Sequence, residues 1–276
     1  MSDEMLETLT QQVLRGAKYR EIAPALVRRI GAQELAKRRS LKEAVKATKN
    51  KLHQVGGAYQ PGRIDYEKGL EMLRETATST SLSTGVSSPH FRAICHSMMQ
   101  AHASTRERLP ILDEFYQTTL ADLPPIRTVL DLACGLNPLA YPWLPLPPDV
   151  QYTAVDIYGD MLDFIQQFFA LAGVNGRTEQ RDIIGNPPTE PADLILLLKT
   201  LPCLEQVDKT AAANLIDALN GRFLLISYPA QSLGGRSKGM VENYTTQFEA
   251  LADGRSWQVQ KFEFVTELAF LVTTDS

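Results

Sequence analysis

Cysteine, tryptophan and long apolar runs are scarce in this chain. Its 276 residues include 3 cysteines and 2 tryptophans. Cys95, Cys134 and Cys203 are spaced neither as a disulfide framework nor as metal ligands, so we expect a reducing compartment and no bound metal. No apolar run approaches the roughly 18 residues that a membrane span needs. Residues 1–10 are acidic and lack the apolar core of a signal peptide. We therefore expect a cytoplasmic protein with no membrane partner.

Charge is unevenly divided along the chain. Residues 1–110 hold 18 Lys+Arg and 11 Asp+Glu, a net charge of +7, whereas residues 111–276 hold 10 and 21, a net charge of −11; together they give the overall −4. Nine of the cations fall between Arg28 and Lys51, with two acidic residues among them. A basic N-terminal part followed by an acidic remainder favours an N-terminal region that binds a polyanion.

A helix beginning near Ser40 carries much of this positive charge. Its apolar residues recur with helical spacing on one face, and its lysines lie three and four residues apart on the other. Cations at this spacing can follow RNA phosphates, although a solvated helical face gives the same pattern. The candidate RNA-binding residues here are Arg38, Arg39, Lys42, Lys46 and Lys49.

The order of apolar segments predicts two domains. Residues 1–88 have mainly helical periodicity and end in a Ser/Thr-rich stretch, which predicts a basic, all-helical RNA-docking domain. Residues 89–276 begin with helices, the second expected over 105–120, and then alternate strands with helices before a closing strand pair. This order is typical of an α/β sheet with an antiparallel edge.

The turn after the first predicted strand lacks the glycines of a pyrophosphate site. The strand at 129–132 runs into Ala133-Cys134-Gly135-Leu136-Asn137-Pro138, where a dinucleotide fold has G-x-G-x-x-G. The Walker A pattern is absent there too. Asn137 and Pro138 are typical of a helix start. We therefore expect a ligand without a pyrophosphate or triphosphate.

Acidic residues at the ends of the next strands suit an adenosine. Asp156 ends the second strand, where a carboxylate can accept both ribose hydroxyls. Asp182 and Ile183 are expected to end a third strand around 179–183, close to the adenine amine and ring. Asp131 is expected to orient the turn or to reach an ammonium group. Together these features favour S-adenosylmethionine, which has no phosphate; the alternative is that these aspartates only cap loops.

Four segments carry a more specific signature: HASTRERL at 102–109, DLACGLNPLA at 131–140, LLLKTLPCLE at 196–205, and SYP with SLGGRSKGM between 227 and 240. Together they resemble the aminoglycoside-resistance methyltransferases of small-subunit ribosomal RNA, which methylate N7 of a decoding-site guanosine. Methyltransferases in general share only the second segment. The resemblance is clear from about residue 90 and looser before it. It implies a Rossmann-like class I methyltransferase sheet with an added all-helical N-terminal domain.

The resemblance also implies roles for individual residues. Arg108 would pair with the methionine carboxylate of the cofactor, Leu198 would lie near its sulfonium, and Tyr59 would cover it from the N-terminal side. The full predicted cofactor-binding set is Tyr59, His102, Ala103, Ser104, Arg108, Ala133, Gly135, Asp156, Asp182, Ile183 and Leu198.

No general base is expected, because guanine N7 has a free lone pair and no proton to lose. We expect Lys199, Arg236 and Lys238 to hold the phosphate or base of the target. The implied substrate is 16S rRNA in the assembled small ribosomal subunit, modified at guanosine 1405, and no protein partner is implied. The alternatives are a methyltransferase of another RNA base or of a small molecule, and a non-catalytic relic that binds rRNA.

Overall fold

The computed structural model describes residues 3–57, 62, 64–79, 88–231 and 239–274. Three of the predicted site residues, Tyr59, Arg236 and Lys238, lie outside the described residues. Within the described part of the chain, no helix is long and apolar enough to cross a membrane.

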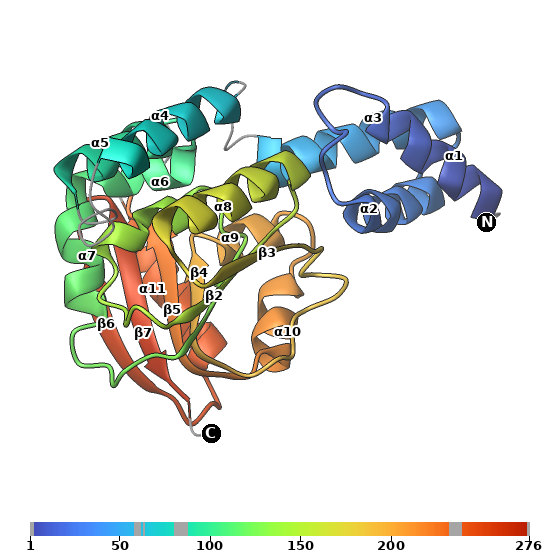
Figure 1. The fold of residues 1–276 in the computed structure, drawn as a ribbon. Helices are drawn as coiled ribbons and strands as arrows, with labels where there is room; N and C mark the ends of the chain where they lie inside the picture. Colours follow the sequence, from blue (N-terminus) through green and yellow to red (C-terminus); the bar gives the residue numbers. More distant parts are fainter. Residues whose placement is uncertain (1–2, 58–61, 63, 80–87, 232–238, 275–276) are drawn as a thin grey trace.

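A seven-stranded sheet forms the body, in the order β3-β2-β1-β4-β5-β7-β6 (Figure 1). The first five strands are parallel, and β7 pairs antiparallel with both β5 and β6. This confirms the predicted α/β class with its antiparallel edge. The strands are β1 Thr128–Leu132, β2 Gln151–Asp156, β3 Gly176–Gln180, β4 Ala192–Leu198, β5 Gly221–Pro229, β6 Gln258–Glu263 and β7 Glu267–Thr273.

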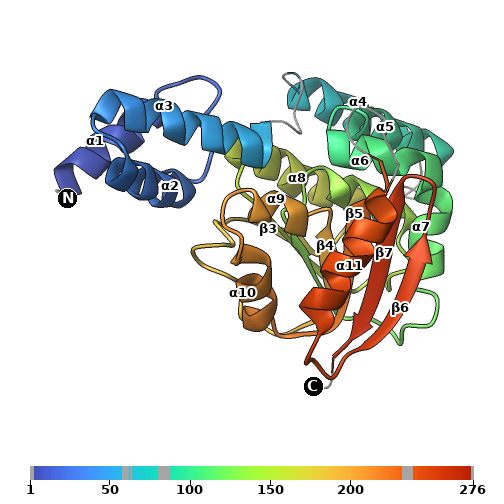
Figure 2. The same cartoon turned by 180° about the vertical axis from the view of Figure 1, so that it is seen from behind.

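Helices cover both faces of this sheet because its central strands are apolar on both sides. In β4, Leu194 and Leu196 pack into one core, and Ile195 and Leu197 pack into the other. The first core is covered by α4 Tyr66–Ser79, α5 Pro89–Met99, α7 Leu112–Thr119 and α8 Gly159–Ala172. The second, seen from behind in Figure 2, is covered by α9 Leu201–Glu205, α10 Ala211–Ala218 and α11 Met240–Ala252.

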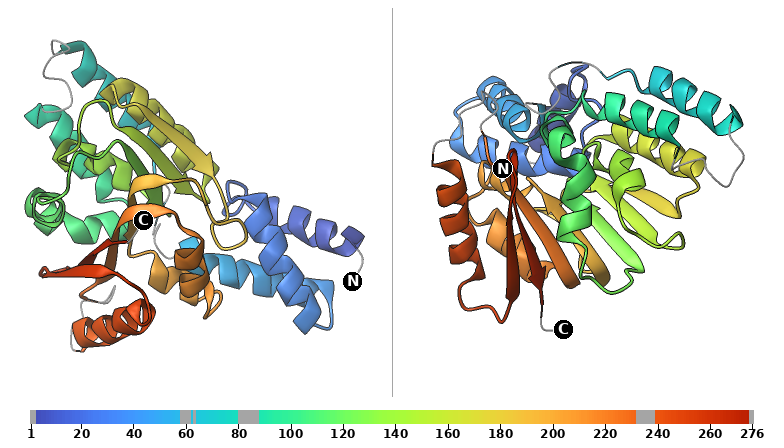
Figure 3. Two further views of the ribbon diagram at one scale, coloured as in Figure 1. Left: turned by 90° about the horizontal axis from the view of Figure 1, so that it is seen from below. Right: turned by 90° about the vertical axis from the view of Figure 1, so that its left-hand side faces the viewer.

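Three N-terminal helices stand beside the body: α1 Asp3–Leu14, α2 Pro24–Lys37 and α3 Leu41–Leu52, which continues into the π-helical turn η1 His53–Gly57 (Figure 3). Pro24 occupies the first turn of α2, where its missing N–H is not needed for the helix. The segment before α2 is fixed to the body, because Ala23 N donates to Ile157 O over 2.8 Å and Gly159 N donates to Glu21 O over 2.8 Å.

Two predicted boundaries were wrong. The third strand ends at Gln180, so Asp182 lies two residues beyond β3 rather than at its end. β3 lies at the sheet edge and its residues are polar. The apolar Ile183 was therefore wrongly assigned to the strand, although it lies beyond its end. The helix expected over 105–120 is divided into α6 Ala103–Arg108, the 3-10 turn η2 Leu109–Ile111, and α7. Pro110 explains the break, because it has no backbone N–H to donate.

The helix expected to start at Asn137 is a 3-10 helix, η3 Asn137–Trp143. Pro138 lies in its first turn, as the sequence predicted, and Pro142 lies inside it. A second proline so close to the first prevents the backbone hydrogen-bond pattern of a longer α-helix.

Candidate cofactor-binding site

A pocket opens at the carboxyl ends of β1, β2 and β4, where ligands bind in doubly wound sheets. The structure brings most of the predicted cofactor-binding residues together there. Those that line the pocket are His102, Ser104, Ala133, Gly135, Asp156, Asp182, Ile183 and Leu198, joined by Lys199. Ala103 and Arg108 are not among the lining residues.

The turn after β1 brings its backbone close to the pocket. Ala133 and Gly135 both have a φ of 51°. A Cβ atom added to Gly135 would lie 2.7 Å from His102 Cε1. The φ favours glycine at position 135, and the short distance to His102 leaves no space for a Cβ atom there, whereas Ala133 holds the same φ with a Cβ.

Asp156 connects this turn to the end of β2. Its Oδ2 accepts a hydrogen bond from Gly135 N over 2.9 Å, and its Oδ1 accepts one from Ile157 N over 2.6 Å. Burial raises the pKa of this carboxyl although backbone N–H groups oppose the shift. Tyr158 N also donates to Oδ1, over 3.4 Å, so Oδ2 is the oxygen that keeps acceptor capacity for a hydroxyl, which fits the predicted role in binding the ribose.

The carboxylate of Asp182 forms an ion pair with Arg29, a residue that the sequence did not indicate as part of the site. Arg29, on α2, donates from Nε to Asp182 Oδ2 over 2.6 Å and from Nη2 to Oδ1 over 2.9 Å. Leu26, one turn earlier on α2, and Gly56 also line the pocket. The N-terminal helices therefore supply one wall of the pocket.

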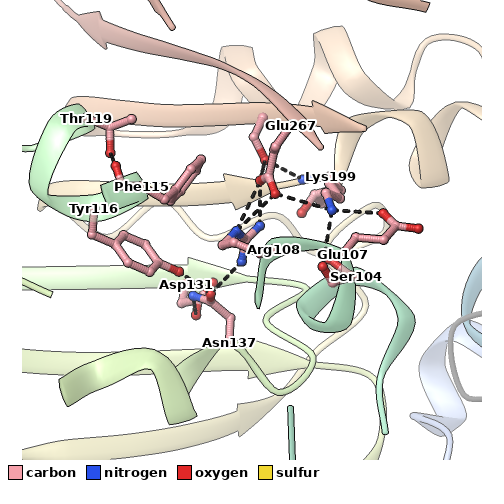
Figure 4. A network of polar contacts seen from close by, with 12 residues as sticks. Ser104, Glu107, Arg108, Phe115, Tyr116, Thr119, Asp131, Asn137, Lys199 and Glu267 are labelled. Carbon is pink, nitrogen blue, oxygen red and sulfur yellow. Dashed lines mark hydrogen bonds and ion pairs between the residues drawn. The ribbon is translucent and has the colours of Figure 1, made fainter. Parts of the chain in front are cut away.

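Arg108 lies in a buried polar network beside the pocket (Figure 4). Its Nη2 is 2.6 Å from Glu267 Oε1, its Nε is 3.1 Å from Glu267 Oε2, and its Nη1 donates to Asn137 Oδ1 over 2.8 Å. Both members of the ion pair are fully buried. Its predicted pairing with the methionine carboxylate stays a prediction.

Glu267 is the anion that this network shares. Although burial acts to raise the pKa of its carboxyl, the cations of Arg108 and Lys199 hold that pKa below its usual value. Ser227 also donates to Glu267 Oε1. In the sequence, Glu267 stands directly before the apolar run of β7. A charge beside such a run needs a buried partner, and this is the one sequence feature that could have predicted an ion pair for Glu267.

Lys199 is held at the end of β4 in an unusual conformation, with a φ of 60°. Its Nζ lies 2.9 Å from Glu107 Oε2 and 3.3 Å from Glu267 Oε2, and it donates to Ser104 O over 3.2 Å. Backbone strain of this kind is found at functional sites more often than elsewhere. The ion pairs keep the lysine at the pocket wall.

Asp131 sits below the turn. Its Oδ2 accepts from Asn137 Nδ2 over 2.8 Å and from Tyr152 OH over 2.7 Å. Burial raises the pKa of Asp131 to about 6. Of its two predicted roles, these contacts favour orienting the turn.

His102 lies close to the turn at Gly135. Burial lowers the pKa of His102 to about 4, with further repulsion from Lys199, Arg106 and Arg108. The imidazole is therefore neutral at pH 7. A neutral ring adds no positive charge to the pocket.

The predicted RNA-binding cations lie on the N-terminal helices, away from the pocket. Arg38, Arg39 and Lys46 line one shallow hollow, and Lys42 is exposed. Lys49 is half-buried, with its ammonium 5.7 Å from the centre of the Tyr19 ring. The buried face of α3 carries Ala44, Thr48 and Leu52, which lie four residues apart as expected for one helical face.

Comparison with known proteins gives the same family from sequence and from structure. The family model "Ribosomal RNA methyltransferase (FmrO)" matches residues 15–271. A 16S rRNA (guanine(1405)-N(7))-methyltransferase of Micromonospora rosea is 38% identical over 271 residues, covering 98% of this chain and 97% of that protein. The protein of the same name from Serratia marcescens is 34% identical over 260 residues, covering 94% of this chain and 95% of that protein. A crystal structure of 16S rRNA methyltransferase RmtF in complex with S-adenosyl-L-homocysteine superposes with a TM-score of 0.82 at 28% identity, over 99% of this chain and 100% of that one. The chain therefore belongs to the ribosomal RNA methyltransferase (FmrO) family.

Proposed function

We propose that this protein transfers a methyl group from S-adenosylmethionine to N7 of guanosine 1405 in 16S rRNA, and so confers resistance to aminoglycosides that contact this guanosine. The observation that carries the proposal is the pocket at the strand ends, whose lining combines the acidic Asp156 and Asp182 with His102, Ser104 and Lys199. Carboxylates suit the hydroxyls and amine of an adenosine, and the remaining polar groups suit an amino-acid tail. The names of three relatives give the same nucleotide, guanine 1405 of 16S rRNA, as the one they methylate.

The residues of the pocket fit S-adenosylmethionine. Asp156 would hold the ribose through Oδ2, which accepts from Gly135 N and has a second lone pair for a hydroxyl. Asp182 and Ile183 would hold the adenine, and Leu198 would contact the region of the sulfonium. Ala133 and Gly135 would meet the ligand with their backbone, since the turn leaves no room for a side chain at Gly135.

The reaction needs alignment more than acid–base chemistry. When bound, S-adenosylmethionine supplies a methyl group on a positively charged sulfur. Guanine N7 is nucleophilic without deprotonation, so the protein has only to position it. Lys199, held by ion pairs with Glu107 and Glu267, would contact the base or its phosphate. His102, neutral at pH 7, would add no positive charge beside the cationic sulfur of the cofactor.

The substrate is expected to bind through the basic N-terminal region. We propose residues 1–88 as the RNA-docking domain and 89–276 as the methyltransferase domain, acting on the assembled small subunit in the cytoplasm. Arg38, Arg39, Lys42, Lys46 and Lys49 are the proposed phosphate contacts. In A-form RNA, N7 faces a deep groove that side chains read poorly, so the target base has to be turned out of the stack.

The test is a methyl-transfer assay with labelled cofactor on three substrates: intact small subunits, free 16S rRNA, and a small-molecule extract. We expect transfer to the intact subunits and none to the extract. Transfer only to the extract would show a small-molecule enzyme, and cofactor binding without transfer to any of the three would show a relic. Cofactor binding is measured separately by calorimetry with S-adenosylhomocysteine.

A further inference from the structure

The carboxylate of Asp182 is bound on both oxygens by a side chain from the N-terminal helices. Arg29 Nε lies 2.6 Å from Oδ2 and Arg29 Nη2 lies 2.9 Å from Oδ1. The Arg29 side chain is 20% exposed and that of Asp182 is 5% exposed. A bidentate guanidinium–carboxylate pair with this little solvent is among the stronger polar contacts in proteins. Arg29 therefore fixes the orientation of Asp182.

The turn after β3 leaves space for the ion pair between Arg29 and Asp182. A Cβ atom added to Gly185 would lie 2.8 Å from Asp182 Oδ2 and 3.1 Å from Arg29 Cδ. Ile184 N donates to Asp182 Oδ1 over 3.2 Å. The turn that follows β3 thus wraps the carboxylate closely and leaves room for the arginine only because residue 185 has no side chain.

The helix that carries Arg29 is itself anchored beside the ribose end of the pocket. Ala23, just before α2, donates to Ile157 O, the residue that follows Asp156. Leu26, one turn before Arg29, lines the pocket. A single helix of the N-terminal region therefore contacts both the end of β2 and the turn after β3.

We propose that Arg29 is a positioning residue for adenine recognition. It holds Asp182 so that a carboxylate lone pair points to the exocyclic amine of the cofactor. Each carboxylate oxygen has two lone pairs, so Oδ2 can accept from Arg29 and from the amine together. The N-terminal helices thereby complete the cofactor site as well as docking RNA. The inference rests on the proposed function, because it assumes that the pocket holds an adenosyl cofactor.

A positioning role makes a prediction that a simple tie between the two parts of the chain does not. If Arg29 only joins the helices to the body, its loss weakens every ligand of the pocket equally. If Arg29 aims Asp182 at the amine, its loss weakens only ligands that carry the amine. The neighbouring Arg28 is a matched control, because it pairs with Glu7 and Asp3 at the surface of the same helices.

The test is calorimetric titration of the full chain with two ligands: S-adenosylhomocysteine, and its analogue with hydrogen in place of the 6-amino group. The quantity measured is the ratio of the two affinities. We expect wild type and Arg28→Ala to prefer S-adenosylhomocysteine by about tenfold or more, as for a hydrogen bond to a charged group. Asp182→Ala and Arg29→Ala should bring the ratio close to one. Arg29→Lys, which keeps the charge but not the bidentate geometry, should give an intermediate ratio and serves if the alanine variant does not fold.

Two results would overturn the inference. One is an Arg29→Ala or Arg29→Lys protein that keeps the wild-type ratio, which would leave Arg29 as a tie only. The other is a wild-type ratio of one, which would show that Asp182 does not recognise the amine. A wild-type protein that binds neither ligand is a different failure, since it contradicts the proposed function itself.

Discussion

Gly135 N donates a hydrogen bond to Asp156 Oδ2 over 2.9 Å, so the glycine turn after β1 and the acid after β2 form one unit. Asp156→Ala removes both the proposed ribose acceptor and the partner of this turn. We expect it to abolish detectable binding of S-adenosylhomocysteine, while binding to small subunits stays nearly unchanged. Calorimetry and subunit co-sedimentation measure the two properties. Asp160→Ala, at an exposed carboxylate in the first turn of α8, is the control and should bind the cofactor normally.

The space at Gly135 gives a second prediction. Gly135→Ala forces a positive φ on a residue with a Cβ and puts that atom 2.7 Å from His102 Cε1. Gly173→Ala imposes the same kind of φ, 66°, but the added atom meets nothing within 4 Å. We expect Gly173→Ala to destabilise the protein by about 1 kcal/mol through strain alone. Gly135→Ala should cost clearly more in urea unfolding and should also weaken cofactor binding. Equal losses for the two variants would show that the contact with His102 relaxes freely.

The buried pair between Arg108 and Glu267 predicts a large effect on stability. Glu267→Ala leaves the fully buried Arg108 guanidinium without its anion, and removing one partner of such a pair costs about 3–5 kcal/mol. Glu263→Ala removes an exposed partner of Lys261 and should cost at most about 1 kcal/mol. Urea unfolding of both variants measures the difference. A Glu267→Ala protein as stable as Glu263→Ala would contradict the account of this network.

The lowered pKa of His102 predicts a dependence of stability on pH. In the folded protein the His102 imidazole becomes protonated only near pH 4, whereas in the unfolded chain it becomes protonated near the ordinary pKa of 6.5. Between these values the unfolded state holds more protons, so the contribution of His102 is complete above pH 6.5 and is lost as pH falls toward 4. We expect wild type to lose about 2 kcal/mol more than His102→Asn between pH 7.5 and pH 4.5. Parallel losses in the two proteins would mean that His102 is protonated as easily folded as unfolded.

The cationic face of α3 predicts a loss of docking without a loss of cofactor binding. Lys42, Lys46 and Lys49 changed together to glutamine should weaken binding to small subunits and make it less dependent on salt. The slope of log affinity against log salt should fall by about one for each lysine that contacts a phosphate. A matched triple change at the exposed Lys68, Lys209 and Lys261 should alter neither. Normal methylation by the Lys42, Lys46 and Lys49 variant would identify this stripe as a solvated face.

The sequence was informative wherever one local pattern determined the structure. The apolar run of β4 and the single-glycine turn were both readable without a fold, and Asp156 lies where the end of a strand was expected. The polar β3 shows the limit, because an edge strand of sequence GRTEQ has no apolar alternation to mark its end.

Partners far apart in the chain could not be predicted. Arg29 and Asp182 are 153 residues apart, and Arg108 and Glu267 are 159 apart. Only folding brings such charges together. In the sequence, a basic residue in a basic helix has the same pattern whether its side chain contacts RNA or a buried carboxylate. In the sequence Arg29 is only one of the nine cations between Arg28 and Lys51, and nothing there indicates that it pairs with Asp182 at the pocket.

The most direct test of the central claim is to map the modified nucleotide. The protein is expressed in a bacterium that lacks this methylation, and 16S rRNA from its small subunits is analysed for N7-methylguanosine by chemical cleavage and mass spectrometry, with Asp156→Ala as the inactive control. The account predicts one new N7-methylguanosine, at position 1405, present with the wild type and absent with the variant. An unmodified guanosine 1405, or a new methyl group on another nucleotide alone, would contradict it.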